Sequence, residues 1–165
     1  MSGKILLASL TAFGINLAYA SITIPIVKFN PAGQAQNIGS ITAEDGLCGV
    51  LLTPNLHDLP PGIHGFHVHV NPSCEQNGMA AKGHLDPGKT DEHNGPYSRT
   101  GHQGDLPVLI VNSDGTANLP TLAPKFKLDK LKGHAFMIHA GGDNYSDHPE
   151  KLGGGGARIA CGVIE

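Results

Sequence analysis

The feature that most limits the possible folds is a series of short apolar runs separated by glycine and proline. The chain has 165 residues, with 23 Gly and 12 Pro, and no window carries the sustained apolar stripe of a long helix. The run at 21–27 alternates apolar and other residues, which is the period of a half-buried strand, and similar short runs follow it. We expect strands within residues 21–27, 39–42, 49–53, 65–70, 108–111, 117–122, 135–139 and 157–163. About eight short strands punctuated in this way predict an all-β antiparallel sandwich or barrel in one domain.

Several local patterns refine this expectation. Pro25 lies inside the first run, and because proline lacks an N–H we expect that strand at a sheet edge. The sequence Asn-Ser-Asp-Gly at 112–115 predicts a hairpin turn, and residues 126–131 predict a short helical turn. Two long stretches, 71–104 and 140–156, are polar and glycine-rich. Loops of this length in a compact domain are usually functional, so we expect both to serve a site.

The first twenty residues have the pattern of a secretory signal peptide. One cation, Lys4, precedes an apolar run that ends on Ala18-Tyr19-Ala20, with small residues flanking a larger one. A membrane anchor and a buried N-terminal helix are the alternatives, but polar residues interrupt the apolar run. We therefore expect a signal peptide at 1–20, a mature domain at 21–165 and a periplasmic location.

The charge balance and the cysteines narrow the class further. The chain has 11 basic and 14 acidic side chains, so a nucleic-acid binder with a basic footprint is not expected. No other stretch is apolar enough to span a bilayer, so no membrane contact is expected after signal cleavage. Cys48, Cys74 and Cys161 would lie in an oxidising compartment, where one disulfide and one spare thiol is the simplest arrangement.

The chain has ten histidines and no tryptophan, and part of the histidine set is spaced like metal ligands. His67 and His69 lie in a predicted strand, where residues two apart face the same side of a sheet. His139 ends another predicted strand and could join them in an all-imidazole site, which suits copper as well as zinc. Three more histidines and a carboxylate follow in the first long loop, a donor set that suits tetrahedral zinc: His84, His93, His102 and Asp105.

Two further residues are candidates because of where they stand. Asp143 follows His139 by four residues and could accept N–H bonds from ligand imidazoles, which would fix their orientation. Arg158 follows four consecutive glycines and is either a surface cation or an anion-recognising donor beside the metal. The histidines outside this pattern, which lack comparable spacing, are expected to be structural or exposed: His57, His64, His134 and His148.

Taken together, these motifs resemble the copper/zinc superoxide dismutases, and the secreted bacterial branch in particular. The matching blocks, in chain order, are GFHVHV (65–70), GHLDP (83–87), GHQGDLP (101–107), HAGGDNYSD (139–147) and GGGGARIACGVI (153–164). They cover essentially the whole predicted mature chain. The resemblance implies an eight-stranded Greek-key β-barrel, also described as a sandwich, with two long functional loops.

The resemblance also implies a role for each candidate residue. It implies four copper ligands, namely His67, His69, His84 and His139. It implies a zinc site that shares the bridging His84 and adds His93, His102 and Asp105. Asp143 would link the two sites, Arg158 would attract superoxide, and Cys74 and Cys161 would form the disulfide.

The implied activity is the disproportionation of superoxide to O₂ and H₂O₂, with copper cycling between two oxidation states and His84 passing a proton. A periplasmic metal buffer and a structural β-sandwich with incidental histidines are the rival functions.

Two features depart from the family pattern. The segment between Cys74 and His84 is shorter than in many relatives, which leaves a homodimer open. Cys48 is an extra thiol, expected to be buried and inert because of its apolar neighbours, with an intermolecular disulfide as the alternative.

Overall fold

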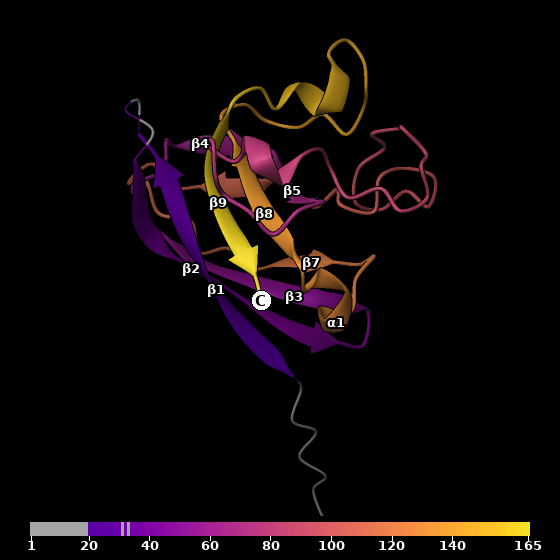
Figure 1. Ribbon diagram of the computed structural model, residues 1–165, viewed down its shortest axis with the longest axis horizontal. Helices are drawn as coiled ribbons and strands as arrows, with labels where there is room; N and C mark the ends of the chain where they lie inside the picture. The colour runs from indigo at the N-terminus through magenta and orange to yellow at the C-terminus, as the bar shows by residue number, and fades with distance from the viewer. Residues whose placement is uncertain (1–19, 31, 33) are drawn as a thin grey trace, which may run out of the picture.

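The computed structural model describes residues 20–30, 32 and 34–165, which fold into an all-β domain (Figure 1). The predicted signal peptide, except for Ala20, lies outside these residues. The strands are β1 (Ser21–Phe29), β2 (Ala35–Gly46), β3 (Gly49–Leu56), β4 (Gly62–His64), β5 (Phe66–His69), β6 (Leu109–Val111), β7 (Thr121–Ala123), β8 (His134–His139) and β9 (Arg158–Ile164). Three short helical segments accompany them: η1 (Met79–Ala81), α1 (Leu128–Leu131) and η2 (Lys151–Gly154).

All strand pairs are antiparallel, as the sequence predicted. Seven strands form one curled sheet in the order β5-β8-β9-β1-β2-β3-β7, and β4 pairs with β6 in a second, two-stranded sheet. The order is not sequential, because β9 returns to lie between β8 and β1. Figure 1 shows that both long loops leave the strands on the same side of the domain. That arrangement allows two segments far apart in sequence to build one site.

The core forms because the strands alternate buried and exposed side chains. In β3 the buried positions include Val50, Leu52 and Leu56, with exposed residues between them. In β5 the pattern differs, because all four residues are buried. Phe66 and Val68 belong to the main core cluster, and the Phe66 ring lies 5.2 Å from that of Phe136 on β8. His67 and His69, which alternate with these two residues along β5, must therefore point to the opposite, equally enclosed face.

The strand count in the described residues is nine rather than eight. The additional strand is β4, a three-residue element that follows a pair of prolines and is too short to show a period. The run predicted at 117–122 also differs. Ala117 forms an isolated bridge with Leu56, and the regular strand begins only at Thr121. The predicted helical turn within 126–131 is present as α1.

Pro25 does not lie on an edge strand, because β1 has β9 on one side and β2 on the other. The missing N–H is tolerated for another reason. β1 pairs with β9 only at Val27 and Lys28, and a bulge separates Pro25 from these residues. The β9 ladder has therefore ended before it reaches the proline.

The hairpin expected at 112–115 was also only partly right. The turn exists, since Asn112 and Gly115 are joined by a 3.0 Å backbone hydrogen bond. The flanking segments then separate, with β6 pairing with β4 and β7 pairing with β3. A good turn sequence thus fixes the chain reversal but not the partner of each strand.

Cys48 is exposed, so the expectation of a buried thiol was wrong. It lies in the tight connection between β2 and β3, where Leu47 is also 89% exposed. Apolar neighbours in sequence do not bury a side chain at the tip of a two-residue turn. Among the described residues, none of the helices is long and apolar enough to cross a membrane.

Candidate metal centre

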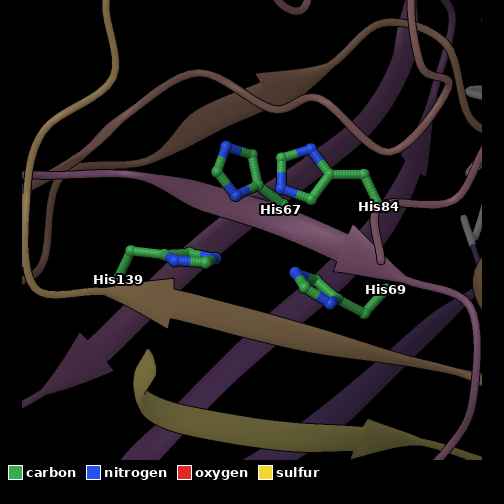
Figure 2. A group of neighbouring side chains, drawn as sticks. All are labelled: His67, His69, His84 and His139. Atoms are coloured by element: carbon green, nitrogen blue, oxygen red, sulfur yellow. The ribbon is translucent and has the colours of Figure 1, made fainter. Parts of the chain in front are cut away.

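Three of the candidate histidines are positioned by β5 and β8, which lie side by side in the sheet. His67 pairs with Met137 and His69 with Ala135, so both histidines of β5 lie beside β8 in the sheet. His139 is the last residue of β8. Figure 2 shows the three rings turned toward one another from these two strands. The alternation that buries Phe66 and Val68 in the core therefore gathers the imidazoles on the other face.

The first long loop brings a fourth histidine to the same place by folding back along the edge of β5. Val68 donates its N–H to Gly104 O at 2.8 Å and accepts a bond from Leu85 N at 2.8 Å. His84 lies opposite His69 in a single bridge. Gly104 allows this close approach, because a Cβ there would collide with the carbonyl oxygen of Val68.

The four rings form the first cluster, His67, His69, His84 and His139. One ring nitrogen from each lies within 4.8 Å of the others, and all four residues are buried. The His67 and His84 rings are stacked with centroids 3.9 Å apart. We call this group the four-histidine cluster.

The tautomers in the four-histidine cluster follow from the hydrogen bonds at the outer nitrogens. His67 Nε2 faces Asp143 Oδ2 at 2.8 Å, His69 Nδ1 faces Lys82 O at 2.7 Å, and His139 Nδ1 faces Gly156 O at 3.2 Å. Each of these nitrogens must donate, since its partner is an acceptor. The inward nitrogens have no hydrogen-bond partner: His67 Nδ1, His69 Nε2, His84 Nε2 and His139 Nε2. Four buried, unpaired lone pairs aimed at one point are a donor set that fits a metal ion.

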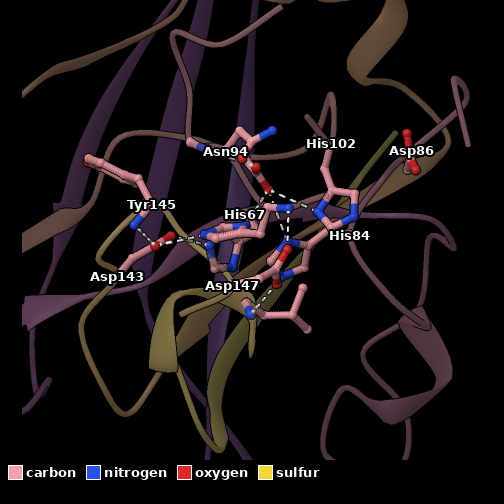
Figure 3. Close-up of polar contacts among 12 residues, drawn as sticks. His67, His84, Asp86, Asn94, His102, Asp143, Tyr145 and Asp147 are labelled. Atoms are coloured by element: carbon pink, nitrogen blue, oxygen red, sulfur yellow. Dashed lines mark hydrogen bonds and ion pairs between the residues drawn. The ribbon is translucent and has the colours of Figure 1, made fainter. Parts of the chain in front are cut away.

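A second cluster lies against the first and shares His84. Its other members are His93, His102 and Asp105, and Asp105 Oδ1 lies 3.1 Å from His84 Nδ1, 3.0 Å from His93 Nδ1 and 3.5 Å from His102 Nδ1. Figure 3 shows His84 and His102 converging there. We call this group the carboxylate cluster. His84 thus offers Nδ1 to one cluster and Nε2 to the other.

Asp143 connects the two clusters from behind. Its carboxylate accepts from His67 Nε2 at 2.8 Å and from His93 Nε2 at 2.7 Å, and its side chain is fully buried (Figure 3). Although burial acts to raise it, these two hydrogen bonds hold the pKa of Asp143 well below its usual range. Gly153 covers the carboxylate, because a Cβ at that residue would collide with Asp143 Oδ1.

The protonation states suit metal binding in the four-histidine cluster. Burial, helped by neighbouring histidines, lowers the pKa of His67 to about 3 and that of His69 to about 2. Burial likewise lowers the pKa of His139 to about 4. These rings are therefore neutral at neutral pH and keep the lone pairs that a metal requires.

The carboxylate cluster is different, because it holds a proton. Burial acts against it, but hydrogen bonds to Asp105 and Asp143 raise the pKa of His93 to about 9. The same contacts to histidines lower the pKa of Asp105, against the effect of burial. The metal-free carboxylate cluster thus contains a charged imidazole between two carboxylates.

Arg158 places a positive charge beside the four-histidine cluster. It begins β9 opposite His139, is half-buried, and donates through Nη1 to Gly78 O and through Nη2 to Lys82 O. Burial and the neighbouring His84 are the larger causes that lower the pKa of His69 and His139, and the positive charge of Arg158 lowers both pKa values further. The guanidinium is therefore close enough to act on whatever the cluster binds.

The expected disulfide is present. Cys74 and Cys161 are bonded with their Cα atoms 5.7 Å apart. The bond ties the start of the first long loop to β9, three residues after Arg158. The loop segment that holds the guanidinium is thus fixed to the strand that carries it.

The sequence analysis missed two residues that hold the loops in place. Asp147 accepts from the backbone N–H of His93 at 2.9 Å and of Leu152 at 3.0 Å, so it joins the two long loops. It lay within a quoted motif but was given no role. Lys125 donates to His102 O at 2.8 Å. Nothing in its basic surroundings in the sequence distinguished it from the neighbouring lysines.

Six imidazoles and one carboxylate therefore meet in two adjacent four-ligand groups that share one histidine. A curled antiparallel β-domain with such a centre defines a class of proteins that bind two metal ions side by side. The family described as "Copper/zinc superoxide dismutase (SODC)" matches residues 36–164. The chain belongs to this family, as the sequence motifs had suggested, and copper and zinc are the metals that define it.

Individual relatives agree with this placement. A superoxide dismutase [Cu-Zn] 1 of Salmonella typhimurium is 59% identical over 151 residues, covering 84% of this chain and 85% of the relative. The structure of the Cu/Zn superoxide dismutase from Brucella abortus is 46% identical with a TM-score of 0.82, covering 88% of this chain and all of that one. The solution structure of the monomeric copper, zinc enzyme from Salmonella enterica is 48% identical with a TM-score of 0.75, over 88% and 100% of the two chains.

Proposed function

We propose that the chain disproportionates superoxide, two anions and two protons giving O₂ and H₂O₂, at a copper ion held by the four-histidine cluster. The observation that carries this assignment is the set of inward ring nitrogens that are buried without hydrogen-bond partners. Each would cost free energy if it stayed unpaired in a dry interior. Four nitrogen donors suit copper, which binds such ligands more strongly than zinc does.

We assign the carboxylate cluster to zinc. Three nitrogens and one oxygen are a tetrahedral set that zinc commonly takes in closed structural sites. The donors already face one another, with His102 Nδ1 buried and otherwise unpartnered. Zinc in that place would neutralise Asp105 and hold His84 from the side opposite the copper site.

The chemistry divides between the metal and the chain. Copper, when bound, supplies the one-electron exchange, because it has two accessible oxidation states and zinc has one. His84 Nε2 is the atom suited to hold a proton for the peroxide product, since it lies in the four-histidine cluster and has no other partner. His84 Nδ1 faces Asp105 Oδ1 in the carboxylate cluster, so a metal held there would leave Nε2 as the ring nitrogen open to a proton.

Arg158 is proposed to attract the anionic substrate. The chain carries a net charge of −3, so its overall field opposes the approach of superoxide. A local cation at the site must reverse this, and such focusing raises association by about 10- to 10³-fold. Two of the guanidinium nitrogens are bonded to backbone carbonyls, but a guanidinium has five N–H donors, so some remain for an anion.

The test is to strip the protein of metal, restore zinc and then copper, and measure superoxide consumption and metal content at each step. We expect activity only after copper is added. A matched pair on β8 makes the test specific: His139→Gln should lose copper and activity, whereas His134→Gln should keep both. His134 is the control because its Nδ1 contacts Val70 O outside the cluster. Copper-loaded protein that consumes no superoxide would support a metal buffer instead and refute the proposal.

We further propose that residues 1–20 are cleaved on export to the periplasm. β1 begins at Ser21, directly after the expected cleavage position, and a disulfide is typical of an oxidising compartment. The named relatives above are bacterial. Cell fractionation with mass measurement of the mature chain tests the proposal, and a full-length cytoplasmic product would contradict it.

A homodimer stays a prediction. The relative from Salmonella enterica is described as monomeric. Sedimentation of the metal-loaded chain decides between the two states.

A further inference from the structure

Lys125 makes two contacts that no part of the proposed chemistry uses. It lies between β7 and α1, outside both long loops, and is half-buried. Its Nζ donates to Gly95 O at 2.9 Å and to His102 O at 2.8 Å. Both acceptors belong to the first long loop, Gly95 lying 30 residues and His102 lying 23 residues before Lys125 in the chain. One ammonium group therefore holds two separate points of the loop that carries the carboxylate cluster.

Those two points enclose the least regular part of the loop. Between Gly95 and His102 the chain forms no strand or helix, and its side-chain bonds there are local ones among exposed residues. The donors of the carboxylate cluster lie at and just beyond both ends of this segment. Opening the segment would therefore separate His93 from His102.

The contacts of Lys125 lead directly to the cluster. Gly95, whose carbonyl accepts from Lys125, also donates its own N–H to Asp105 Oδ2 at 3.2 Å. In return, Gln103 Nε2 donates to Lys125 O at 3.2 Å. Hydrogen bonds from a charged donor are roughly twice as strong as neutral ones. Lysine is suited to this position because a compact ammonium can donate to several carbonyls at once.

We propose that Lys125 is a positioning residue that closes the loop around the carboxylate cluster and thereby sets how firmly zinc is held. The inference deepens the assignment of that cluster to zinc and rests on it. Lys125 contacts no metal-ligating atom. It acts through the backbone carbonyl of His102 and through Gly95, whose carbonyl accepts from Lys125 and whose N–H donates to Asp105.

The experiment uses the chain loaded with copper and zinc and measures the rate at which each metal passes to an excess of chelator. Lys125→Met removes the donors and keeps the length of the side chain. We expect it to speed zinc release by about 10- to 100-fold, the usual effect of losing a group that orients metal ligands. Copper release should speed up less than zinc release, because Lys125 holds the loop of the carboxylate cluster and reaches the four-histidine cluster only through the shared His84. Lys125→Arg can still donate to two carbonyls and should lie between Lys125→Met and the unchanged protein.

Lys127→Met is the matched control. Lys127 is two residues away and also donates to a backbone carbonyl, Gly46 O at 3.0 Å, but at the β2–β3 turn. It should release zinc at the rate of the unchanged protein. Zinc release that is equal in Lys125→Met and Lys127→Met overturns the role of Lys125, and so does copper release that speeds up as much as zinc release. An unchanged protein that holds no zinc contradicts the proposed function instead, so the two failures are distinguishable.

Discussion

Replacing Asp143 by asparagine tests the link between the two metal sites. The carboxylate accepts one hydrogen bond from His67 Nε2 and another from His93 Nε2, with distances of 2.8 and 2.7 Å. Asparagine has almost the same shape but only one acceptor oxygen, and its other terminal atom is a donor. In Asp143→Asn, one ring N–H must therefore face an NH₂ group in a buried site.

The size of the effect follows from these contacts. A hydrogen bond to a charged group contributes about 1.5–3 kcal/mol, and the variant loses at least one of the two. Loss of a group that orients a metal ligand typically lowers affinity about 10- to 100-fold, which corresponds to about 1.4–2.7 kcal/mol. The two routes agree. We expect Asp143→Asn to weaken at least one metal by this amount, depending on which ring keeps the oxygen.

The assay is competition against a chelator of known affinity, carried out separately for zinc and for copper. Asp114→Asn is the control, because Asp114 makes a similar number of hydrogen bonds, all to Thr116 in an exposed turn. If Asp143→Asn binds both metals as tightly as the control does, Asp143 does not orient the ligands and the reasoning fails.

Four further predictions follow from the same contacts. Gly153→Ala should lose metal affinity whereas Gly156→Ala should not. Both glycines have positive φ and share the backbone cost of about 1–2 kcal/mol, but only the first would collide with the buried carboxylate; equal metal contents in the two variants would contradict this. Arg158→Ala should lower kcat/KM about tenfold or more at low ionic strength and flatten its salt dependence, with metal content unchanged. Reducing the disulfide, which spans 87 residues, should destabilise the chain by about 4–5 kcal/mol, most visibly in the Tm of the metal-free form, and equal shifts in both forms would argue against coupling to the loop. Calorimetry of the metal-free protein should show stability falling on both sides of about pH 6.5–7. Below that range the unfolded histidines gain protons that His67, His69 and His139 do not bind in the folded chain, at up to about 1.4 kcal/mol per pH unit for each ring. Above it, folded His93 keeps its proton up to about pH 9 whereas the unfolded ring has released it, so the stabilisation that this proton contributes declines. A flat profile from pH 5 to about pH 9 would refute the assigned protonation states.

The features that could be predicted from the sequence are those that local periodicity determines, namely the positions of most strands and the face to which their side chains point. The His-Val-His run fixed the common face of His67 and His69, because alternation along a strand leaves no other choice. The same logic gave the strands and the antiparallel class. It failed at β4, where three residues cannot show a period, and at the turn after β6, where a correct chain reversal did not determine the partner strand.

Long-range contacts lay beyond this reasoning. No local pattern states that Gly104 packs against Val68 or that Lys125 reaches back to His102. The candidate ligands in the first loop were found by their concentration, and the motif resemblance supplied their grouping. Cys48 shows the reverse failure, since hydropathy of the neighbours suggested burial and the turn geometry exposes the thiol.

The charges in the site explain why the fold and the metals depend on each other. Without metal, the buried centre holds two carboxylates, Asp105 and Asp143, whose pKa values are both lowered, and one protonated ring, His93, so its net charge is −1. A buried net charge of this kind is costly unless it is compensated. Two divalent cations would reverse its sign and at the same time pair the inward nitrogens that lack partners. Because His84 and Asp143 each contact both clusters, the loss of either metal should loosen the ligands of the other, and the two ions should bind as a coupled pair rather than independently.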